Sequence, residues 1–436
     1  MSKLAINGGS KIRKDLFPSY DVLGEEEAMA AYNVVKSGVL SKYLGCWHKD
    51  FFGGPEVQAF EEEWSIMFNA KHSISVNSNT SGIICALGAL NIGPGDEVIV
   101  SGYSMSISAS APLFYGAIPV FADIEENYFC LDPKSVESKI THRTKAVIVV
   151  DIFGQPYDYE GFQKLKNKYG IKIIEDTAQA PYSTLNGSYC GTLGDIGIYS
   201  LNYHKHIHTG EGGMIVTNDS EIATRLQLIR NHAEAVVDGM NYQGDRTNMI
   251  GFNMRLPEIE AAIGRSLLKK LPHLIRERVD NVRYLESKIK DIPFLTMPKI
   301  RHGAEHSYYV HSIRYDKTHA ESVHRNDYIN ALKAELSPCL KREDDGVLIG
   351  AGYVKPLYLQ SLYQSKIGFG KLNYPFNDPN NLSITSYDKG ICPVTERMHF
   401  EEVITHELMR PGLSKFDLDD ISNAFLKVAD NLNELS

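Results

Sequence analysis

Two periods of hydrophobic and polar positions alternate along the first half of the chain. Short apolar runs, typical of buried strands, are separated by segments whose apolar residues recur at helical spacing. The helical segments include residues 57–68 and 81–90. The expected strands are residues 72–76, 97–100, 118–122, 146–150, 171–174, 196–201 and 214–217. This alternation predicts an α/β fold with a mostly parallel sheet between helices.

The pattern changes after residue 255. Long helices are expected at residues 257–271 and 274–289, followed by a strand at 308–314 and a helix at 323–334. Residues 418–435 form an amphipathic pattern, and Asp417 or Asp419 is the expected N-cap. Residues of about 341–391 are rich in Gly, Pro, Tyr and Asn and have weak periodicity, which predicts a loop-rich insertion. We therefore expect a large domain at 1–270, including the N-terminal segment, and a smaller C-terminal α+β domain at 271–436.

Composition narrows the class of protein. Of the 436 residues, 43% are hydrophobic and 23% are charged, the balance of an ordinary globular protein. The net charge of −9 argues against nucleic acid as a main partner, because a phosphate-binding face needs clustered Lys and Arg. No apolar segment has the length of a signal peptide or membrane span. The six cysteines form no C-x-x-C pair, so we expect reduced thiols in a cytoplasmic protein.

The first motif with chemical potential follows the expected strand at 171–174. Glu175 and Asp176 lie at its carboxyl end. In an open α/β sheet this edge binds ligands, and burying carboxylates there is costly unless they are used. An alternative is that Asp176 only caps a helix that begins at Thr177. The motif by itself does not decide between these two interpretations.

The second motif lies between the last two expected strands and contains Lys205. A lone lysine in such a turn is normally a solvated surface charge. Here Lys205 follows the carboxylate strand by one supersecondary unit, and residues 210–213 (Gly-Glu-Gly-Gly) allow close approach of the backbone. The alternating His204, His206 and His208 could suggest a metal site, but no second group of His or Cys stands out, so we expect no metal.

The third motif, at residues 77–82, reads Asn-Ser-Asn-Thr-Ser-Gly and joins a strand to a helix. Free N–H groups and small hydroxyl side chains at a helix start can bind a phosphate. The same residues also serve as ordinary N-caps. The motif is therefore a weak signal when taken alone.

In this order, the three motifs resemble those of the DegT/DnrJ/EryC1/StrS family of sugar aminotransferases, which have the fold of type I pyridoxal-phosphate enzymes. The family's E-D-x-A-Q-A motif matches residues 175–180 in full. Its S-F-x-x-x-K-x-x-x-x-G-E-G-G motif matches residues 200–213, with Leu201 in place of Phe. Further matches are G-G-x-x-x-R at residues 8–13 and G-P-G-D-E-V-I at residues 93–99. The similarity covers nearly the whole chain.

This resemblance implies pyridoxal 5′-phosphate (PLP, or its amine form PMP) as the cofactor. Lys205 would be the Schiff-base lysine and would also move the proton during catalysis. Asp176 would pair with the pyridinium nitrogen, so that the ring acts as an electron sink. Gln179 would donate a hydrogen bond to the 3-oxygen of the ring.

The resemblance also assigns the remaining contacts of the cofactor. Asn79, Thr80 and Ser200 would hold its phosphate. Asn253 would reach the phosphate in the partner subunit, which implies a homodimer with shared active sites. The family places an aromatic residue over the ring. The matching position here is Met105, and Tyr103 is the alternative.

The function implied is transfer of an amino group from glutamate or glutamine to a keto sugar, usually nucleotide-linked. A keto-cyclitol or an aminohydroxybenzoate-type substrate is an alternative within the same reaction. A sugar dehydratase of the same fold would carry His in place of Lys205. A non-catalytic regulator would not need Lys205, Asp176 and Gln179 together. The insertion at about 341–391 either contributes to substrate specificity or is a surface loop.

Overall fold

The computed structural model describes residues 3–379, 381 and 385–435, and its centre is a seven-stranded sheet. All seven expected strands are present, which confirms the mostly parallel α/β arrangement. Strand β9 alone in this sheet runs against its neighbours. The strand order is β1 (His72–Val76), β9 (Gly213–Thr217), β8 (Ile196–Ser200), β5 (Lys172–Asp176), β4 (Thr144–Val150), β2 (Glu97–Ser101) and β3 (Ile118–Ala122).

Helices cover both faces of this sheet, because its strands are apolar on both sides. Val98 and Val100 of β2 lie in one core, whereas Ile99 lies in the other. This is the alternation expected of successive residues in a strand. The first face packs against α3 (Asn79–Ala89), α4 (Ile107–Phe114) and α7 (Ser220–Arg230). The second face packs against α2 (Pro55–Phe68), α5 (Pro133–Glu137), α6 (Tyr159–Tyr169) and the start of α9 (Glu258–Ile289).

Helix α9 corrects one expectation from the sequence. The two helices expected at 257–271 and 274–289 are one continuous helix with Pro272 in its interior. An internal proline costs about 3 kcal/mol. Burial of one large apolar side chain contributes about 1.5–3 kcal/mol, and α9 buries several. Leu267 packs against the large sheet and Leu285 packs in the C-terminal core, so tertiary contacts on both sides of Pro272 keep the helix intact.

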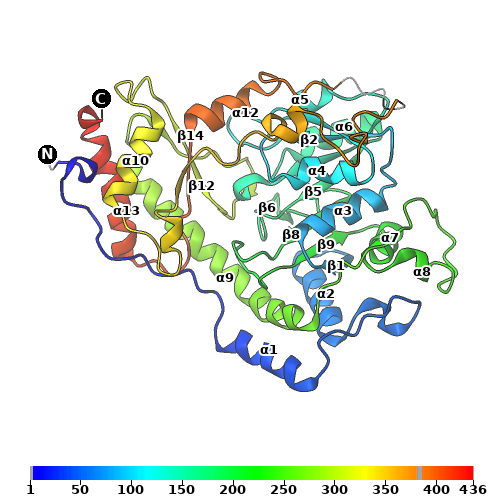
Figure 1. Ribbon diagram of the computed structural model, residues 1–436. Coiled ribbons are helices and arrows are strands. Elements are labelled where there is room, and N and C mark those ends of the chain that lie inside the picture. The colour runs from blue at the N-terminus through cyan, green and yellow to red at the C-terminus, as the bar shows by residue number, and fades with distance from the viewer. Residues whose placement is uncertain (1–2, 380, 382–384, 436) are drawn as a thin grey trace.

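A second sheet forms the core of the C-terminal part. Its antiparallel strands lie in the order β10 (Leu295–Thr296), β12 (His311–Tyr315), β14 (Val403–His406) and β13 (Ile349–Ala351). Helices α10 (Arg325–Glu335) and α13 (Lys415–Ala429) share this core with Leu4 and Phe17 of the N-terminal segment. Figure 1 shows both ends of the chain beside these helices, with α9 leading from them toward α2. A domain boundary at residue 270 stays a prediction.

The last long helix begins earlier than the sequence suggested. It starts at Lys415, and its N-cap is Ser414 rather than Asp417 or Asp419. The Ser414 Oγ accepts a hydrogen bond from the Asp417 N–H at 3.3 Å, and Asp417 Oδ2 accepts one from the Ser414 N–H at 2.7 Å. Asp417 is therefore the partner of the cap in a capping box, which explains why it resembled the cap itself.

The expected loop-rich region at 341–391 contains β13 and the short helix α11 (Ser361–Gln364). Three of its tyrosines are buried against the large sheet. Tyr358 and Tyr363 pack on Phe121 of β3, and the hydroxyl of Tyr387 donates a hydrogen bond to the Pro119 carbonyl at 2.9 Å. The described part of this insertion is therefore attached to the outer edge of the sheet rather than projecting from it.

The described residues form further α-helices and strands. Helix α1 (Glu25–Ser37) packs along α9. The others are α8 (Ala233–Val236), α12 (Pro393–Arg397) and a small sheet of β6 (Thr184–Leu185), β7 (Ser188–Tyr189) and β11 (Ala304–Glu305). Within the described ranges, no helix combines the length and the apolar character needed to cross a membrane.

Candidate active site

The carboxyl ends of adjacent strands bring the sequence motifs together. Asp176 ends β5 and pairs in register with Ile198 of β8. Lys205 lies in the turn between β8 and β9. Because β5 and β8 are parallel neighbours, both residues lie at the same edge of the sheet. The start of α3, which follows β1, also reaches this edge, where the side chain of Asn79 contacts Asp176.

Asp176 is a buried carboxylate with few partners. Its side chain is 3% exposed, and Oδ1 accepts hydrogen bonds from Asn79 Nδ2 and from the Ala178 N–H, both at 3.1 Å. Burial raises the pKa of Asp176 above its usual range, and the Ala178 N–H, Lys205 and Asn79 oppose this shift. Both hydrogen bonds described for this side chain end at Oδ1. The remaining oxygen is thus available to a cationic ligand, which would offset the cost of burial.

Lys205 is a buried amine beside this carboxylate. The residue is 9% exposed, and its Nζ lies 4.3 Å from the ring centroid of Tyr309. Within the described part of the chain, Nζ makes no hydrogen bond and no ion pair within 4 Å. An amine held on an aromatic face without a hydrogen-bond acceptor is accessible for chemistry at its lone pair once it loses a proton.

Gln179 is fixed by two hydrogen bonds. Its Oε1 accepts from the Phe153 N–H at 2.7 Å, and its Nε2 donates to the hydroxyl of Tyr353 at 2.9 Å. Phe153 has a φ of 61°, a left-handed conformation that is unfavourable for a bulky residue. The Phe153 carbonyl also accepts from the Tyr309 N–H at 2.7 Å. Both backbone groups of this strained residue are therefore used to hold the site.

The start of α3 lies where the phosphate cradle is expected, and binding of a phosphate there stays a prediction. Ser78 is the N-cap, and its Oγ accepts from the Ser81 N–H at 3.1 Å. The N–H groups of Asn79 and Thr80, the first residues of the helix, have no carbonyl acceptor within it. Thr80 is exposed at this edge of the sheet, whereas Ser200, at the end of β8, is buried. The partial positive charge of the helix dipole and the unused N–H groups at the start of α3 together favour binding of an anion.

The structure places Met105 and Tyr103 differently. Met105 is half exposed in the turn that precedes α4. Tyr103 is fully buried, with its ring perpendicular to those of Phe153 and Tyr353. Tyr103 is therefore part of the wall behind Gln179. Stacking of Met105 on the ring of a ligand stays a prediction.

Asn253 pairs with Asn231 in an isolated antiparallel bridge. It is exposed, and its Oδ1 accepts a hydrogen bond from Arg255 Nε at 2.7 Å. An exposed position is compatible with the expectation that Asn253 serves a neighbouring subunit. That role also stays a prediction.

The histidines of the lysine turn do not gather as metal ligands. His206 is buried and its Nε2 lies 3.1 Å from the Ser307 carbonyl. Among the described residues, the cluster with ligand atoms within 4.8 Å of one another is Asp151, Glu175 and Cys190. The oxygens of Glu175 accept from three backbone N–H groups, which already satisfy this carboxylate. Burial, together with the charge of Glu175, raises the pKa of Asp151 well above its usual range.

Sequence reasoning missed the aromatic residues of the site. Tyr309 contacts Lys205, Tyr353 binds Gln179, and Phe153 binds both Gln179 and Tyr309 through its backbone. These residues come from three distant segments, and none lies in a motif quoted above. Their roles depend on backbone hydrogen bonds and packing, which leave no periodic signal in a sequence.

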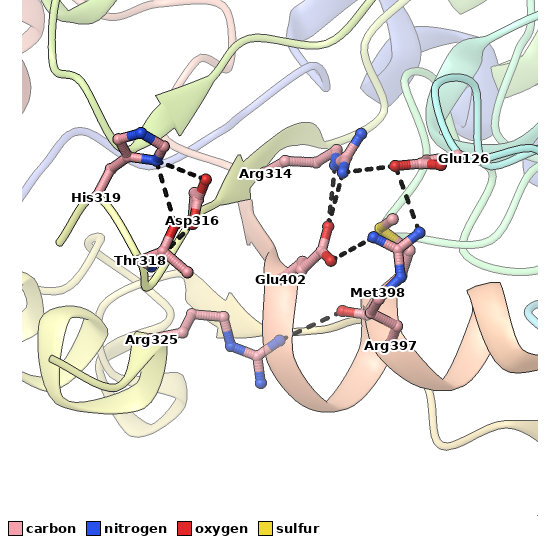
Figure 2. A network of polar contacts seen from close by, with 9 residues as sticks. All are labelled: Glu126, Arg314, Asp316, Thr318, His319, Arg325, Arg397, Met398 and Glu402. Atoms are coloured by element: carbon pink, nitrogen blue, oxygen red, sulfur yellow. Dashed lines mark hydrogen bonds and ion pairs between the residues drawn. The ribbon is translucent and has the colours of Figure 1, made fainter. Parts of the chain in front are cut away.

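A separate cavity of about 650 Å³ lies on the C-terminal sheet and is lined by Arg314, Arg325 and Arg397. Its arginines already have partners. Figure 2 shows Arg314 and Arg397 converging on both Glu126 and Glu402, while Arg325 points to the Met398 carbonyl. Because Glu126 follows β3, this network ties the large sheet to the C-terminal part. We assign it a structural role.

Comparison with known proteins agrees with this geometry. Residues 46–379 match the model of the DegT/DnrJ/EryC1/StrS aminotransferase family. Spore coat polysaccharide biosynthesis protein SpsC of Bacillus subtilis is 31% identical over 82% of this chain and 87% of its own length. The L-glutamine:2-deoxy-scyllo-inosose aminotransferase of Streptomyces lividus is 27% identical over 98% of this chain and 97% of its own length.

Solved structures show the same architecture. DesV of S. venezuelae has a TM-score of 0.77 and 25% identity, with 96% of this chain and 100% of that chain covered. GDP-4-keto-6-deoxymannose-3-dehydratase (ColD) has a TM-score of 0.73 and 23% identity, with 94% and 100% covered. At that identity the likeness to ColD concerns the fold alone. The neighbouring structures confirm the fold of type I PLP-dependent enzymes.

Proposed function

The chain belongs to the DegT/DnrJ/EryC1/StrS aminotransferase family of PLP-dependent enzymes, and we propose that it transfers an amino group from glutamate or glutamine to a keto group on a cyclic polyol. The observation that carries this proposal is the buried pair formed by Lys205 and Asp176 at the carboxyl edge of the sheet. A buried amine beside a buried carboxylate is costly to fold unless a ligand uses both groups.

The residues of this edge fit PLP. Asp176 offers a buried carboxylate oxygen to the ring nitrogen, Gln179 offers an amide N–H to the ring oxygen, and the start of α3 offers backbone N–H groups to the phosphate. When bound, PLP supplies an electron sink for the carbon that loses its proton. Lys205 would remove and return that proton at Nζ. Asp176 would keep a proton on the ring nitrogen, because a buried carboxylate favours an adjacent cation.

A second subunit is part of this proposal. The partner subunit's Asn253 would contact the phosphate, as the family pattern implies. Several large apolar side chains near the start of the chain and near Asn253 are exposed, which supports a surface covered by a second copy. They are Met29, Tyr32, Val35, Leu40, Leu44, Trp47, Ile250 and Phe252.

Two acceptor classes are candidates. A nucleotide-linked keto sugar is the usual substrate of the family. One observation favours a keto-cyclitol. The L-glutamine:2-deoxy-scyllo-inosose aminotransferase of S. lividus is similar to this protein over nearly the whole chain. That match covers 98% of this chain, and the insertion at 341–391 contributes Tyr353 to the site. Dehydration is disfavoured because the position of the Schiff-base lysine in the family motif holds Lys205, where the dehydratases carry His.

A direct assay tests the proposal and separates the acceptors. Purified protein with PLP is expected to show a visible absorption band that disappears when glutamate or glutamine is added. The correct ketone should then restore the band and yield an amine, with kcat/KM at least about 100-fold above that of the other acceptor class. A band that no amino donor changes would contradict transamination. Water loss without amine formation would instead assign the dehydratase reaction.

The proposed phosphate cradle makes a further prediction. A Cβ added at Gly213 would lie 2.7 Å from the Ser78 carbonyl carbon and 2.8 Å from the Asn79 nitrogen. The start of α3 must therefore shift in the Gly213→Ala variant, and we expect affinity for PLP to fall about tenfold, the equivalent of one weakened hydrogen bond. Titration of apoprotein with PLP measures this effect.

The matched control is Gly93→Ala. A Cβ at Gly93 has no neighbour within 4 Å, and Gly93 lies in the turn before β2. This variant should bind PLP as the parent does. Equal affinity in Gly213→Ala and Gly93→Ala would show that α3 does not hold the phosphate.

A further inference from the structure

Tyr353 is brought into the site from the loop-rich insertion by a turn that requires glycine. The Gly352 N–H donates to the Val403 carbonyl at 2.7 Å, and the Gly352 carbonyl accepts from Thr405 Oγ1 at 2.9 Å. Gly352 has a φ of 72°, and a Cβ there would lie 2.6 Å from the His399 carbonyl oxygen. Strand β14 thus anchors this turn on both sides of the glycine, which fixes where the next residue lies.

The side chain of Tyr353 is held just as firmly. Its ring is nearly perpendicular to that of Phe153, with centroids 5.3 Å apart, and to that of Tyr103, with centroids 6.0 Å apart. Edge-to-face packing of this kind favours one ring orientation. Burial is the main cause that raises the pKa of Tyr353 above its usual value, so the hydroxyl is neutral at physiological pH.

The hydrogen bonds of Gln179 show what the fixed position of the Tyr353 hydroxyl does in the site. Because Oε1 accepts from the Phe153 N–H, the amide has one orientation, and Nε2 must face the other way. One of the two N–H groups on Nε2 donates to the Tyr353 hydroxyl at 2.9 Å. The second N–H is then directed by geometry and is left for a ligand. Removing the Tyr353 oxygen would leave both N–H groups of Nε2 without this constraint.

We infer that Tyr353 is a positioning residue, which holds Gln179 so that its second amide N–H donates to the ring oxygen of PLP. The inference rests on the proposed function of the site. It assigns the loop-rich insertion an indirect role in holding the cofactor, through a residue outside every motif that identifies the family. Tyr353 would act on the cofactor only through Gln179.

The test compares holoenzyme carrying Tyr353→Phe with holoenzyme carrying Tyr363→Phe. Tyr363 is a buried tyrosine of the same insertion, but it packs on Phe121 and Tyr387, away from Gln179. In Tyr353→Phe the pH midpoint of the visible cofactor band should rise by about 0.5–1 unit. The reason is that a weakened donor stabilises the unprotonated chromophore less, by about one hydrogen bond. The midpoint in Tyr363→Phe should match that of the parent.

A double-mutant cycle shows whether the effect passes through Gln179. In a Gln179→Ala background, Tyr353→Phe should shift the midpoint no further, because the two residues act as a unit. A midpoint in Tyr353→Phe equal to that of the parent would overturn the inference, as would a full additional shift in the double variant. If the parent protein shows no visible band with PLP, the proposed function fails instead. Thermal unfolding of each variant distinguishes a shifted midpoint from a misfolded protein.

Discussion

Replacing Lys205 with alanine is expected to reduce transamination by at least about 10³-fold, since nucleophilic attachment and general-base proton transfer are both lost. Lys205 Nζ is the amine placed at the carboxyl edge of the sheet near Asp176, and its described contact is the face of the Tyr309 ring. Without Nζ there is no amine to hold the cofactor covalently and no base to move the proton. Steady-state kinetics and the visible spectrum of the variant measure both losses.

Lys205→Arg is the matched control for charge. A guanidinium keeps the positive charge and can still lie on the Tyr309 ring, but it stays protonated and is a poor nucleophile. We expect Lys205→Arg to be as inactive as Lys205→Ala. Added methylamine should restore part of the proton transfer in Lys205→Ala. Activity of Lys205→Arg near that of the parent would mean that Lys205 contributes only charge.

Replacing Asp176 with asparagine is expected to lower kcat/KM by about 10²–10³-fold, the loss of roughly 3–4 kcal/mol of electrostatic stabilisation in a dry site. The two side chains have the same shape, and asparagine can still accept from Asn79 and Ala178 at Oδ1. The variant therefore removes the negative charge and little else. Stopped-flow measurement of the half-reaction with the amino donor would locate the effect in proton removal.

The thermal stability of Asp176→Asn is an independent test of the role of the Asp176 charge. Burial raises the pKa of Asp176 in the folded protein, so ionisation of this group destabilises the apoprotein as pH rises above the unfolded value. At neutral pH the apo form of Asp176→Asn should unfold at a temperature no lower than that of the parent. The stabilisation by added PLP should be smaller in the variant. A large loss of apoprotein stability would assign Asp176 a structural role instead.

Asp195→Asn is the control variant for Asp176→Asn, because Asp195 lies at the amino ends of the same strands. Asp195 precedes β8 and accepts from the Ile173 N–H at 2.9 Å, at the amino ends of the strands. This variant loses a carboxylate of the same sheet without touching the lysine turn. Its kcat/KM should stay within about twofold of the parent, because Asp195 lies at the amino ends of the strands and its ion pairs are with Lys166 and Lys172, not with the lysine turn.

Much of the fold was predictable from local pattern. Strands buried on both faces appear as continuous apolar runs, and their boundaries were right within two residues or so because polar turn residues follow each run. Two predictions from local pattern were wrong, namely the helix break at Pro272 and the N-cap at Asp417. In both cases, contacts with residues distant in sequence or an alternative local hydrogen bond outweighed the local signal.

The sequence by itself determined the strand–helix alternation and the motifs that place Asp176 and Lys205 at the ends of neighbouring strands. These features depend on side-chain period and on short segments, which a linear sequence records directly. Only the tertiary structure decided that α9 is continuous, that Met105 is half exposed while Tyr103 is buried, and that Tyr309 and Tyr353 reach Lys205 and Gln179. Those outcomes follow from packing between segments that are distant in the sequence, which no local pattern encodes.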